Sequence, residues 1–233
     1  HAGVCSPEDF AARAAAYGLP AVALTDTDRM SGLIRFYLAC RSHGIKPILG
    51  VELTDPAAER ISVNSYRSLD APDSKPRIGH SGTRSSSFSE NQPASHTKPI
   101  HAGSAHIVLL AKNAQGYGDL CEIITRRHVD PDFTFANIFA EPWPNCFFLT
   151  GFPHLLRQLA ATPNRKALYG EVVNNGALTR RRSRQLEATA RELGLPLAAT
   201  NNSYFLDPDD HDTHRILSAI GLVSPLSRLE PHE

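Results

Sequence analysis

The 233-residue sequence carries no net charge, because its 24 Lys and Arg residues are balanced by 24 Asp and Glu residues. Non-specific binding of nucleic acid depends on an excess of Lys and Arg, so the overall composition does not favour it. The two local basic runs, residues 125–128 and 179–185, are interpreted as solvated helix faces rather than as phosphate-binding patches. No apolar run is long enough for a membrane-spanning helix, which excludes a membrane partner of that kind.

Cysteine is scarce and scattered. The four thiols form no Cys-x-x-Cys pair, whereas the ligands of a structural zinc ion are usually closely spaced, so no such zinc site is predicted. Three of the four lie in apolar or helical contexts and are expected to be buried, which fits a reducing cytoplasm. The cysteines are Cys5, Cys40, Cys121 and Cys146.

Other signatures are also absent. The chain has no initiator Met and no charged-then-apolar signal pattern, so we expect it to begin inside a longer protein. It contains no glycine-rich phosphate loop, no nucleophile elbow and no Ser/His/Asp order. The sequence therefore does not predict catalysis by any of these motifs.

What the sequence does contain is an alternation of strand and helix patterns. Strands are predicted at residues 21–26, 46–53, 106–112, 146–151, 167–173 and 196–201. Helices are predicted at residues 7–17, 29–43, 114–128, 153–161 and 178–193, with a last helix from Pro208 capped by Asp207. This order predicts parallel strands with right-handed crossovers. Polar groups recur where strands end, which favours an incomplete (β/α) barrel over an open sheet. They are Asp26, Glu52, Thr150, Asn201 and Asn202.

The alternation of strand and helix patterns is interrupted by one long segment. Residues 55–105 are rich in Ser, Pro, Gly and Asn and poor in periodic apolar residues, which predicts a disordered insertion within a single domain spanning residues 1–233. Its histidines, His80, His96 and His101, are interpreted as solvated rather than as metal ligands.

Three long blocks then occur in a familiar order. They read PAVALTDTDRMSGLIRFYLACRSHGIKPILGVEL, HIVLLAKNAQGYGDLCEIITRRH and GLPLAATNNSYFLDPDDHDTHRILSAI. Together they resemble the N-terminal PHP (polymerase and histidinol phosphatase) domain of the bacterial DNA polymerase III alpha subunit and its error-prone relatives. The insertion and residues 130–175 match more loosely.

The resemblance implies an α/β fold, a PHP-type distorted (β/α)7 barrel that is incomplete at its N-terminus. Intact members bind up to three metal ions, zinc or manganese among them, through His, Asp and Glu at strand ends, and hydrolyse phosphoesters. In the polymerase the domain precedes the palm, fingers and thumb, where it proofreads or serves as a scaffold. The parent protein is therefore expected to be a cytoplasmic DNA-directed DNA polymerase of replication or repair. The expected partners are its own palm and thumb and, through the parent protein, DNA and other replisome subunits.

Some of the family's metal motifs survive here. The Gly-x-Glu motif is present and ends at Glu52, and the His that precedes the next strand is His106. The Thr-Asp-His motif keeps its acid as Asp26, but Thr27 replaces the His. The His-x-His pair of the opening strand would lie before His1.

The remaining ligand positions are substituted. Phe152 stands where the family has Cys or His, and His154 could replace it only if the loop shifted. The Asp-x-His motif reads Asn202-Ser203-Tyr204, so both of its ligands are missing.

These substitutions predict a degenerate metal site without catalytic residues. Clustered metals need anionic and imidazole ligands, whereas Thr, Asn and Tyr are weak neutral donors and Phe is none. We expect no resident cofactor, or at most one weakly bound zinc or manganese ion on Glu52 and His106, with Asp26 as a weak third ligand. Each of these three residues also has a purely structural interpretation. Glu52 would be a hydrogen-bonded acid, His106 a structural histidine and Asp26 a loop cap.

Three hypotheses about function remain open at this point. The favoured one is a scaffold for the polymerase core, with an active metal-dependent phosphoesterase (a 3′–5′ proofreading exonuclease or a small-molecule phosphatase) as the alternative. The third is a stand-alone regulator that binds a partner through the Ser-rich insertion. A possible His-x-x-His pair near Asp210, His211 and His214 is interpreted as solvated or capping, because it lies in the first turns of a helix.

Overall fold

A computed structural model describes residues 3–55, 105–174, 177–221 and 225–226. The predicted insertion, residues 55–105, falls almost wholly outside these ranges, as do its three histidines and His1. Within the described ranges, no helix combines the length and the apolar character needed to cross a membrane.

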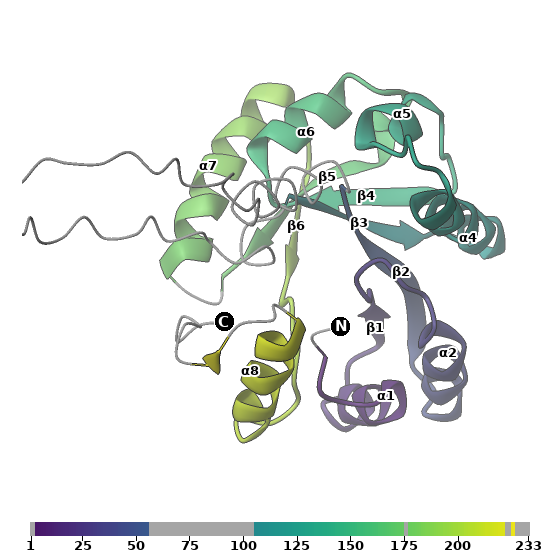
Figure 1. Ribbon diagram of the computed structural model, residues 1–233, viewed down its shortest axis with the longest axis vertical. Helices are drawn as coiled ribbons and strands as arrows, with labels where there is room; N and C mark the ends of the chain where they lie inside the picture. Colours follow the sequence, from purple (N-terminus) through teal and green to yellow (C-terminus); the bar gives the residue numbers. More distant parts are fainter. Residues whose placement is uncertain (1–2, 56–104, 175–176, 222–224, 227–233) are drawn as a thin grey trace, which may run out of the picture.

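Six strands form one mixed sheet that curls into a half barrel (Figure 1). The spatial order follows the chain order, so β1 and β6 are the two edges. The apolar, β-branched character of most of these segments suits strands whose faces are covered by helices. The strands are β1 (Ala21–Leu24), β2 (Lys46–Thr54), β3 (His106–Ala111), β4 (Cys146–Thr150), β5 (Leu168–Val173) and β6 (Leu197–Thr200).

The prediction of parallel strands is wrong for β3. This strand runs antiparallel to both of its neighbours, with Thr54 of β2 opposite His106 and Val108 opposite Leu149 of β4. The other three pairs are parallel. A parallel pair needs a crossover to the opposite end of the sheet, but the chain leaves β2 and re-enters β3 at the same end. The reversal places the first residue of β3 beside the last residues of β2 and β4.

Most helices agree with the prediction, and two boundaries do not. The helix expected from residue 29 begins at Leu33, and the helix expected from Pro208 begins at Asp210. Asp207 does not cap that last helix as predicted, because its carboxylate forms a bidentate ion pair with Arg13 at 2.9 and 2.8 Å. The helices are α1 (Pro7–Ala16), α2 (Leu33–Ser42), α4 (Ala114–Val129), α5 (Phe135–Ala140), α6 (Pro153–Ala160), α7 (Ala177–Leu193), α8 (Asp210–Gly221) and the 3-10 turn η1 (Pro163–Ala167).

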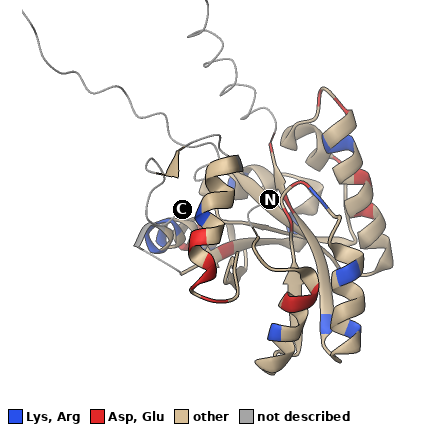
Figure 2. Cartoon of the chain, turned by 60° about the horizontal axis from the view of Figure 1, so that its bottom comes forward, with Lys and Arg blue, Asp and Glu red and all other residues tan. Residues whose placement is uncertain are grey.

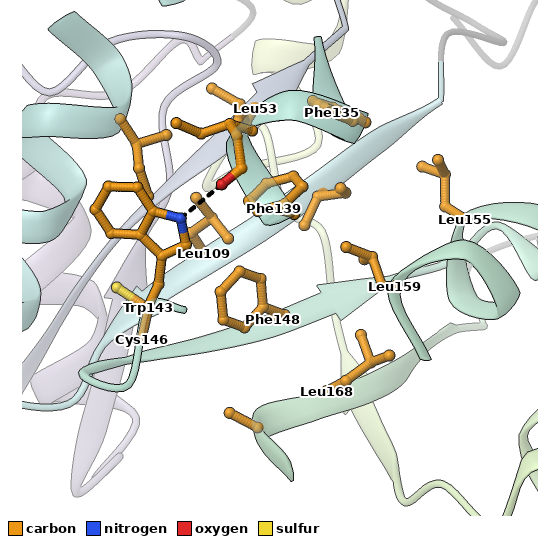
Figure 3. Packing of buried hydrophobic residues seen from close by; sticks show 14 of the residues in the cluster. Leu53, Leu109, Phe135, Phe139, Trp143, Cys146, Phe148, Leu155, Leu159 and Leu168 are labelled. Carbon is orange, nitrogen blue, oxygen red and sulfur yellow. Dashed lines mark hydrogen bonds between the residues drawn. The ribbon is translucent and has the colours of Figure 1, made fainter. Parts of the chain in front are cut away.

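The sequence patterns missed α5 and η1, and these elements close the main core. Phe139 of α5 packs edge-on against Phe148 of β4, with ring centroids 5.5 Å apart. Trp143 follows α5 and donates its indole N–H to the carbonyl of Ile138 at 2.8 Å (Figure 3). Asn164 of η1 accepts from the Trp143 amide at 2.8 Å. This core fills the space between β2–β5 and helices α4–α7, whereas a second cluster lies between α1, α2 and β1.

The cysteine prediction holds for only two residues. Cys40 and Cys146 are fully buried, in the second and the first of these clusters respectively, whereas Cys5 and Cys121 are partly exposed. Cys121 lies on α4 at a position that faces away from the helix residues buried in the core, Leu120 and Ile123.

Candidate functional site

The polar strand ends converge at one end of the half barrel, which we call the mouth. The antiparallel β3 contributes its N-terminus there, beside the C-termini of its neighbours. The hydroxyl of Thr150, at the end of β4, donates to the backbone carbonyl of His106 at 3.0 Å. The structure therefore brings together the surviving family positions Glu52 and His106, as the sequence predicted.

Thr27 and Glu52 are directly connected at the mouth. The two residues form an isolated parallel bridge, and the Thr27 hydroxyl donates to Oε1 of Glu52 at 3.0 Å. The other carboxylate oxygen lies 3.8 Å from Nε2 of His106. The two side chains are largely shielded from solvent, at 16% exposed for Glu52 and 23% for His106. Thr27 thus hydrogen-bonds one oxygen of the carboxylate, at the position where the PHP resemblance implies a histidine.

Asp26, the weak third candidate, is part of the same strand connection. Its backbone carbonyl accepts from the Glu52 amide at 3.1 Å. Burial raises the pKa of its carboxyl group, and the positive charge of Arg29 opposes that shift. Removing a carboxylate from water favours its neutral form, which is a poor metal ligand.

Phe152 closes one side of the mouth. Its buried ring packs edge-on against His106 at a centroid distance of 5.1 Å. The guanidinium of Arg182, from α7, lies over the same ring at 4.7 Å. His154, the possible substitute ligand, is exposed in the first turn of α6 and lies 5.9 Å from the Phe152 ring. Phe152 therefore fills its position with an apolar ring.

The substituted Asp-x-His motif follows β6, and its Asn202 lines a small cavity at the mouth together with Phe152. Asn202 has a left-handed backbone, with φ 49°, a conformation that Asn tolerates better than most residues. Tyr204 stacks on His214 of α8 at 5.2 Å, and its backbone carbonyl accepts from the Val4 amide at 3.0 Å. Burial raises the pKa of the Tyr204 phenol, and the negative charge of Glu52 adds to the shift. The phenol is therefore neutral at physiological pH, and its ring is held by packing.

The interpretation of His214 as solvated or capping is wrong. The residue is 8% exposed, and its ring contacts two aromatic rings, Tyr204 at 5.2 Å and Phe205 at 5.7 Å. His211 is partly exposed and lies 6.0 Å from Phe205. His211 and His214 lie about one helical turn apart in α8. Only the tertiary contacts show that His214 belongs to an aromatic cluster with Tyr204 and Phe205.

A polar network beside the mouth was missed by the sequence patterns. Asp28, in a left-handed conformation with φ 50°, accepts at Oδ1 from the Thr54 amide at 2.9 Å, while the Thr54 hydroxyl donates to Oδ2. Arg127 of α4 donates to Oδ2 of Asp28 at 3.2 Å and to the Thr54 carbonyl at 2.9 Å. His128 lies 2.8 Å from the Asp28 carbonyl oxygen. The network joins the ends of β1 and β2 to the end of α4.

This network corrects one part of the charge interpretation. Arg127 is only 11% exposed and its partner Asp28 16% exposed, so this arginine is not on a solvated helix face. The sequence contains only a weak indication of this ion pair. Asp28 lies two residues beyond a predicted strand end, and Arg127 lies at the basic end of a helix about 100 positions later. No local pattern pairs residues at that separation.

Glu171 is a further acid at the mouth that sequence reasoning missed. It lies on β5, is 8% exposed, and accepts from the Thr200 hydroxyl at 2.7 Å. A small cavity of about 60 Å³ lies next to it. The residues lining this cavity are His106, Gly151, Phe152, Glu171, Val173, Thr179, Arg182, Ser183 and Asn202.

The donor set at the mouth does not fit a cluster of metal ions. Across the described ranges, no three His, Cys, Asp or Glu side chains are grouped so that they could hold one ion. Glu52 and His106 approach each other, but Thr27 already donates to that carboxylate. A cluster needs several anionic ligands to offset the repulsion between cations, whereas the positions that the resemblance assigns to further ligands carry Thr27, Phe152, Asn202 and Tyr204.

Comparison with known proteins places this geometry in a family. The family model described as "PHP domain" matches residues 1–162, which is more than half of the chain. The chain belongs to the PHP domain family. The match covers the mouth residues up to Phe152, including Thr27, Glu52 and His106.

Relatives of this PHP domain are much longer polymerases. The DNA polymerase III subunit alpha of Chlamydia trachomatis is 24% identical over 95% of this chain. An error-prone DNA polymerase of Symbiobacterium thermophilum is 24% identical over 98% of it. The chain spans about a fifth of the length of these relatives, 19% and 20% respectively. Among solved structures, an amidohydrolase from Chromobacterium violaceum is similar over 89% of this chain and 84% of its own, with 16% identity and a TM-score of 0.44.

Proposed function

We propose that this PHP domain is a structural module of a DNA polymerase III alpha-like protein and that its metal site is degenerate. The observation that carries the proposal is the Thr27–Glu52 hydrogen bond of 3.0 Å, which commits the surviving carboxylate to a neutral neighbour. Phe152 supports it, because its buried ring packs on His106, the other surviving position.

The chemistry of the mouth supports the same conclusion. Hydrolysis of a phosphodiester by clustered metals requires ions that activate water and bind the leaving oxygen. The described donors at the mouth are the contacting pair Glu52 and His106, at 3.8 Å, a half-buried Asp26 whose pKa is raised, and Glu171, which accepts from the Thr200 hydroxyl. Such a set supports at most one weakly bound zinc or manganese ion, with no catalytic role.

A structural role is consistent with the contacts observed around the mouth. The Asp28–Thr54–Arg127 network and the Tyr204–His214 stack hold the strand ends without a metal. A domain fixed in this way can support the palm and thumb of the longer chain, and DNA and other replisome subunits would then be reached through that parent protein. An active phosphoesterase is the alternative that the experiment below distinguishes.

Metal analysis of the purified 233-residue chain tests the proposal. After equilibration with excess Zn²⁺ or Mn²⁺ and desalting, we expect fewer than one ion per chain by mass spectrometry and no chelator-sensitive cleavage of a phosphodiester. Two or more ions per chain, together with cleavage that EDTA abolishes, would overturn the proposal and favour the phosphoesterase.

A matched pair of variants sharpens the test. N202D combined with Y204H restores both ligands of the last motif, and T27H restores a third. We expect the triple variant to retain more Zn²⁺ than the unaltered chain, while E52Q added to it removes the gain. If the unaltered chain already retains as much Zn²⁺ as the triple variant, the substituted positions are not what limits binding and the proposal fails.

A further inference from the structure

The two basic runs of the sequence have different surroundings in the structure. In the run on α4, Arg126 pairs with Glu122 and with Glu141, the latter at 2.9 Å, and Arg127 pairs with Asp28 at 3.2 Å. This run is therefore neutralised by the domain's own acids. Figure 2 shows blue and red together on α4, at the right of the view, and a separate blue group on α7 at the left.

Part of the run on α7 has no such neutralising acids among the described residues. Three of its exposed arginines form a group that we call the α7 basic cluster: Arg181, Arg182 and Arg184. In the described part of the chain, Arg181, Arg182 and Arg184 form no ion pair. The nearest acids on the same helix are further along, and one of them, Glu192, is paired with Arg157 at 3.1 Å. The charge of the cluster thus faces solvent.

The placement of this cluster is electrostatically unfavourable for the isolated domain. Cations are disfavoured at a helix N-terminus, because the aligned peptide dipoles leave positive partial charge there. Arginines at positions i and i+3, such as Arg181 and Arg184, also repel each other across one helix face. A negatively charged partner would remove both penalties, since it would lie against the cluster and the helix end together.

The cluster is also continuous with the mouth. Arg182 lies over the Phe152 ring at 4.7 Å, and it lines the small cavity together with Thr179 and Asn202. An arginine guanidinium is planar and carries five N–H donors, so one that lies over an aromatic ring can still donate to an acceptor such as a phosphate. A chain with no net charge has therefore placed an exposed positive group at one edge of its barrel mouth.

We propose that the α7 basic cluster is a binding surface for the phosphate backbone of duplex DNA, contacted without sequence specificity. Arginine is well suited to this contact, because its planar donors bind phosphate oxygens in pairs. The choice of DNA rests on the proposed function, in which the domain belongs to a DNA polymerase. In this proposal α7 itself touches the DNA, rather than reaching it through other parts of the parent protein. The contact does not depend on whether the mouth binds a metal.

The salt dependence of DNA binding tests the proposal. A labelled 20-base-pair duplex is titrated with the full 233-residue chain between 50 and 200 mM KCl, and binding is followed by fluorescence anisotropy. Each phosphate contact contributes about −0.9 to the slope of log K against log salt concentration, so three contacts give about −2.7. We expect R181Q and R184Q each to reduce the magnitude of that slope by about 1.

Matched variants separate this contact from a general loss of charge. R41Q removes one positive charge from an exposed position on α2, and it should leave the slope unchanged. R181K and R184K keep the charge and should keep the slope. All three substituted positions, Arg41, Arg181 and Arg184, are exposed, and circular dichroism confirms that each variant is folded before binding is measured.

Three results would overturn the proposal. One is an unaltered chain whose DNA binding does not depend on salt, and another is a slope that R41Q lowers as much as R181Q does. The third is displacement of the duplex by a glutamate-rich peptide at equal charge concentration, which would point to an acidic protein segment instead. A chain that binds several zinc ions but shows the expected slopes would refute the scaffold proposal while supporting the DNA contact.

Discussion

The hydroxyl of Thr27 donates a hydrogen bond of 3.0 Å to the carboxylate of Glu52, at the mouth of the half barrel. Where the PHP resemblance places a metal-binding imidazole, the domain has a neutral donor that satisfies the acid directly. The contact also bridges the loop after β1 and strand β2, because the two residues are paired along their backbones. The consequence is a mouth whose surviving acid is held by hydrogen bonds within the protein.

We expect T27V to lower the free energy of unfolding by about 1 kcal/mol, because a largely buried carboxylate loses a donor while the side-chain shape is kept. Urea denaturation monitored by the fluorescence of the single Trp, Trp143, measures the change. T125V is the control, since the Thr125 hydroxyl donates to a carbonyl on an exposed helix face. Equal effects of the two substitutions would show that the Thr27 contact contributes nothing specific.

Arg127 and Arg126 are consecutive on α4 and should differ strongly. R127M leaves Asp28 without its cation in a site where both side chains are largely shielded, so we expect a loss of about 2–4 kcal/mol. R126M breaks exposed pairs with Glu122 and Glu141 and should cost less than about 1 kcal/mol.

A double-mutant cycle tests whether that loss belongs to the Asp28–Arg127 pair. D28N keeps a residue that tolerates the left-handed backbone at this position while it removes the charge. The combined D28N and R127M variant should be less destabilised than the sum of the two single changes. Strict additivity would mean that the two residues act independently.

Two glycines of α4 give opposite predictions. A Cβ at Gly116 would lie 2.2 Å from the carbonyl oxygen of Asn145, and because that atom belongs to the backbone it cannot move aside. We expect G116A to destabilise the domain by about 3 kcal/mol. Gly118 is exposed and a Cβ there would meet nothing within 4 Å, so G118A should stabilise by about 0.5–1 kcal/mol through helix propensity. Thermal melts of the two variants that shift in the same direction would contradict this account of α4.

Cys146 should be chemically inert in the folded domain. Burial raises the pKa of its thiol to about 12, and the negative charge of Asp119 adds to the shift. The reactive species is the thiolate, which is scarce at every pH well below that value. We expect iodoacetamide at pH 8 to label the partly exposed Cys121 long before Cys146, and to label both in urea. Peptide mass spectrometry reads each site, and labelling of Cys146 at the rate of Cys121 without urea would show that the start of β4 opens to solvent.

The sequence predicted several of the residues that lie at the candidate site, but not how their side chains contact one another. The positions of Glu52 and His106 follow from strand-end patterns and from the family motifs, and the substitution of Thr27 was visible in the sequence. The structure adds the consequences, which are the hydrogen bond to Glu52 and the packing of Phe152 on His106. These depend on side-chain directions across separate elements, and no spacing within one element encodes them.

The sequence by itself determined the α/β alternation and most helix and strand positions. These features depend on local periodicity, on capping residues such as Ser6 and on short motifs, which neighbouring residues specify together. The tertiary structure alone decided the antiparallel direction of β3, the burial of His214 and the pairing of Arg127 with Asp28. It also decided that one basic run is neutralised, whereas three arginines of the other run, on α7, form no ion pair within the described part of the chain. Each of these depends on contacts between residues far apart in the chain, where burial and charge pairing outweigh local preference.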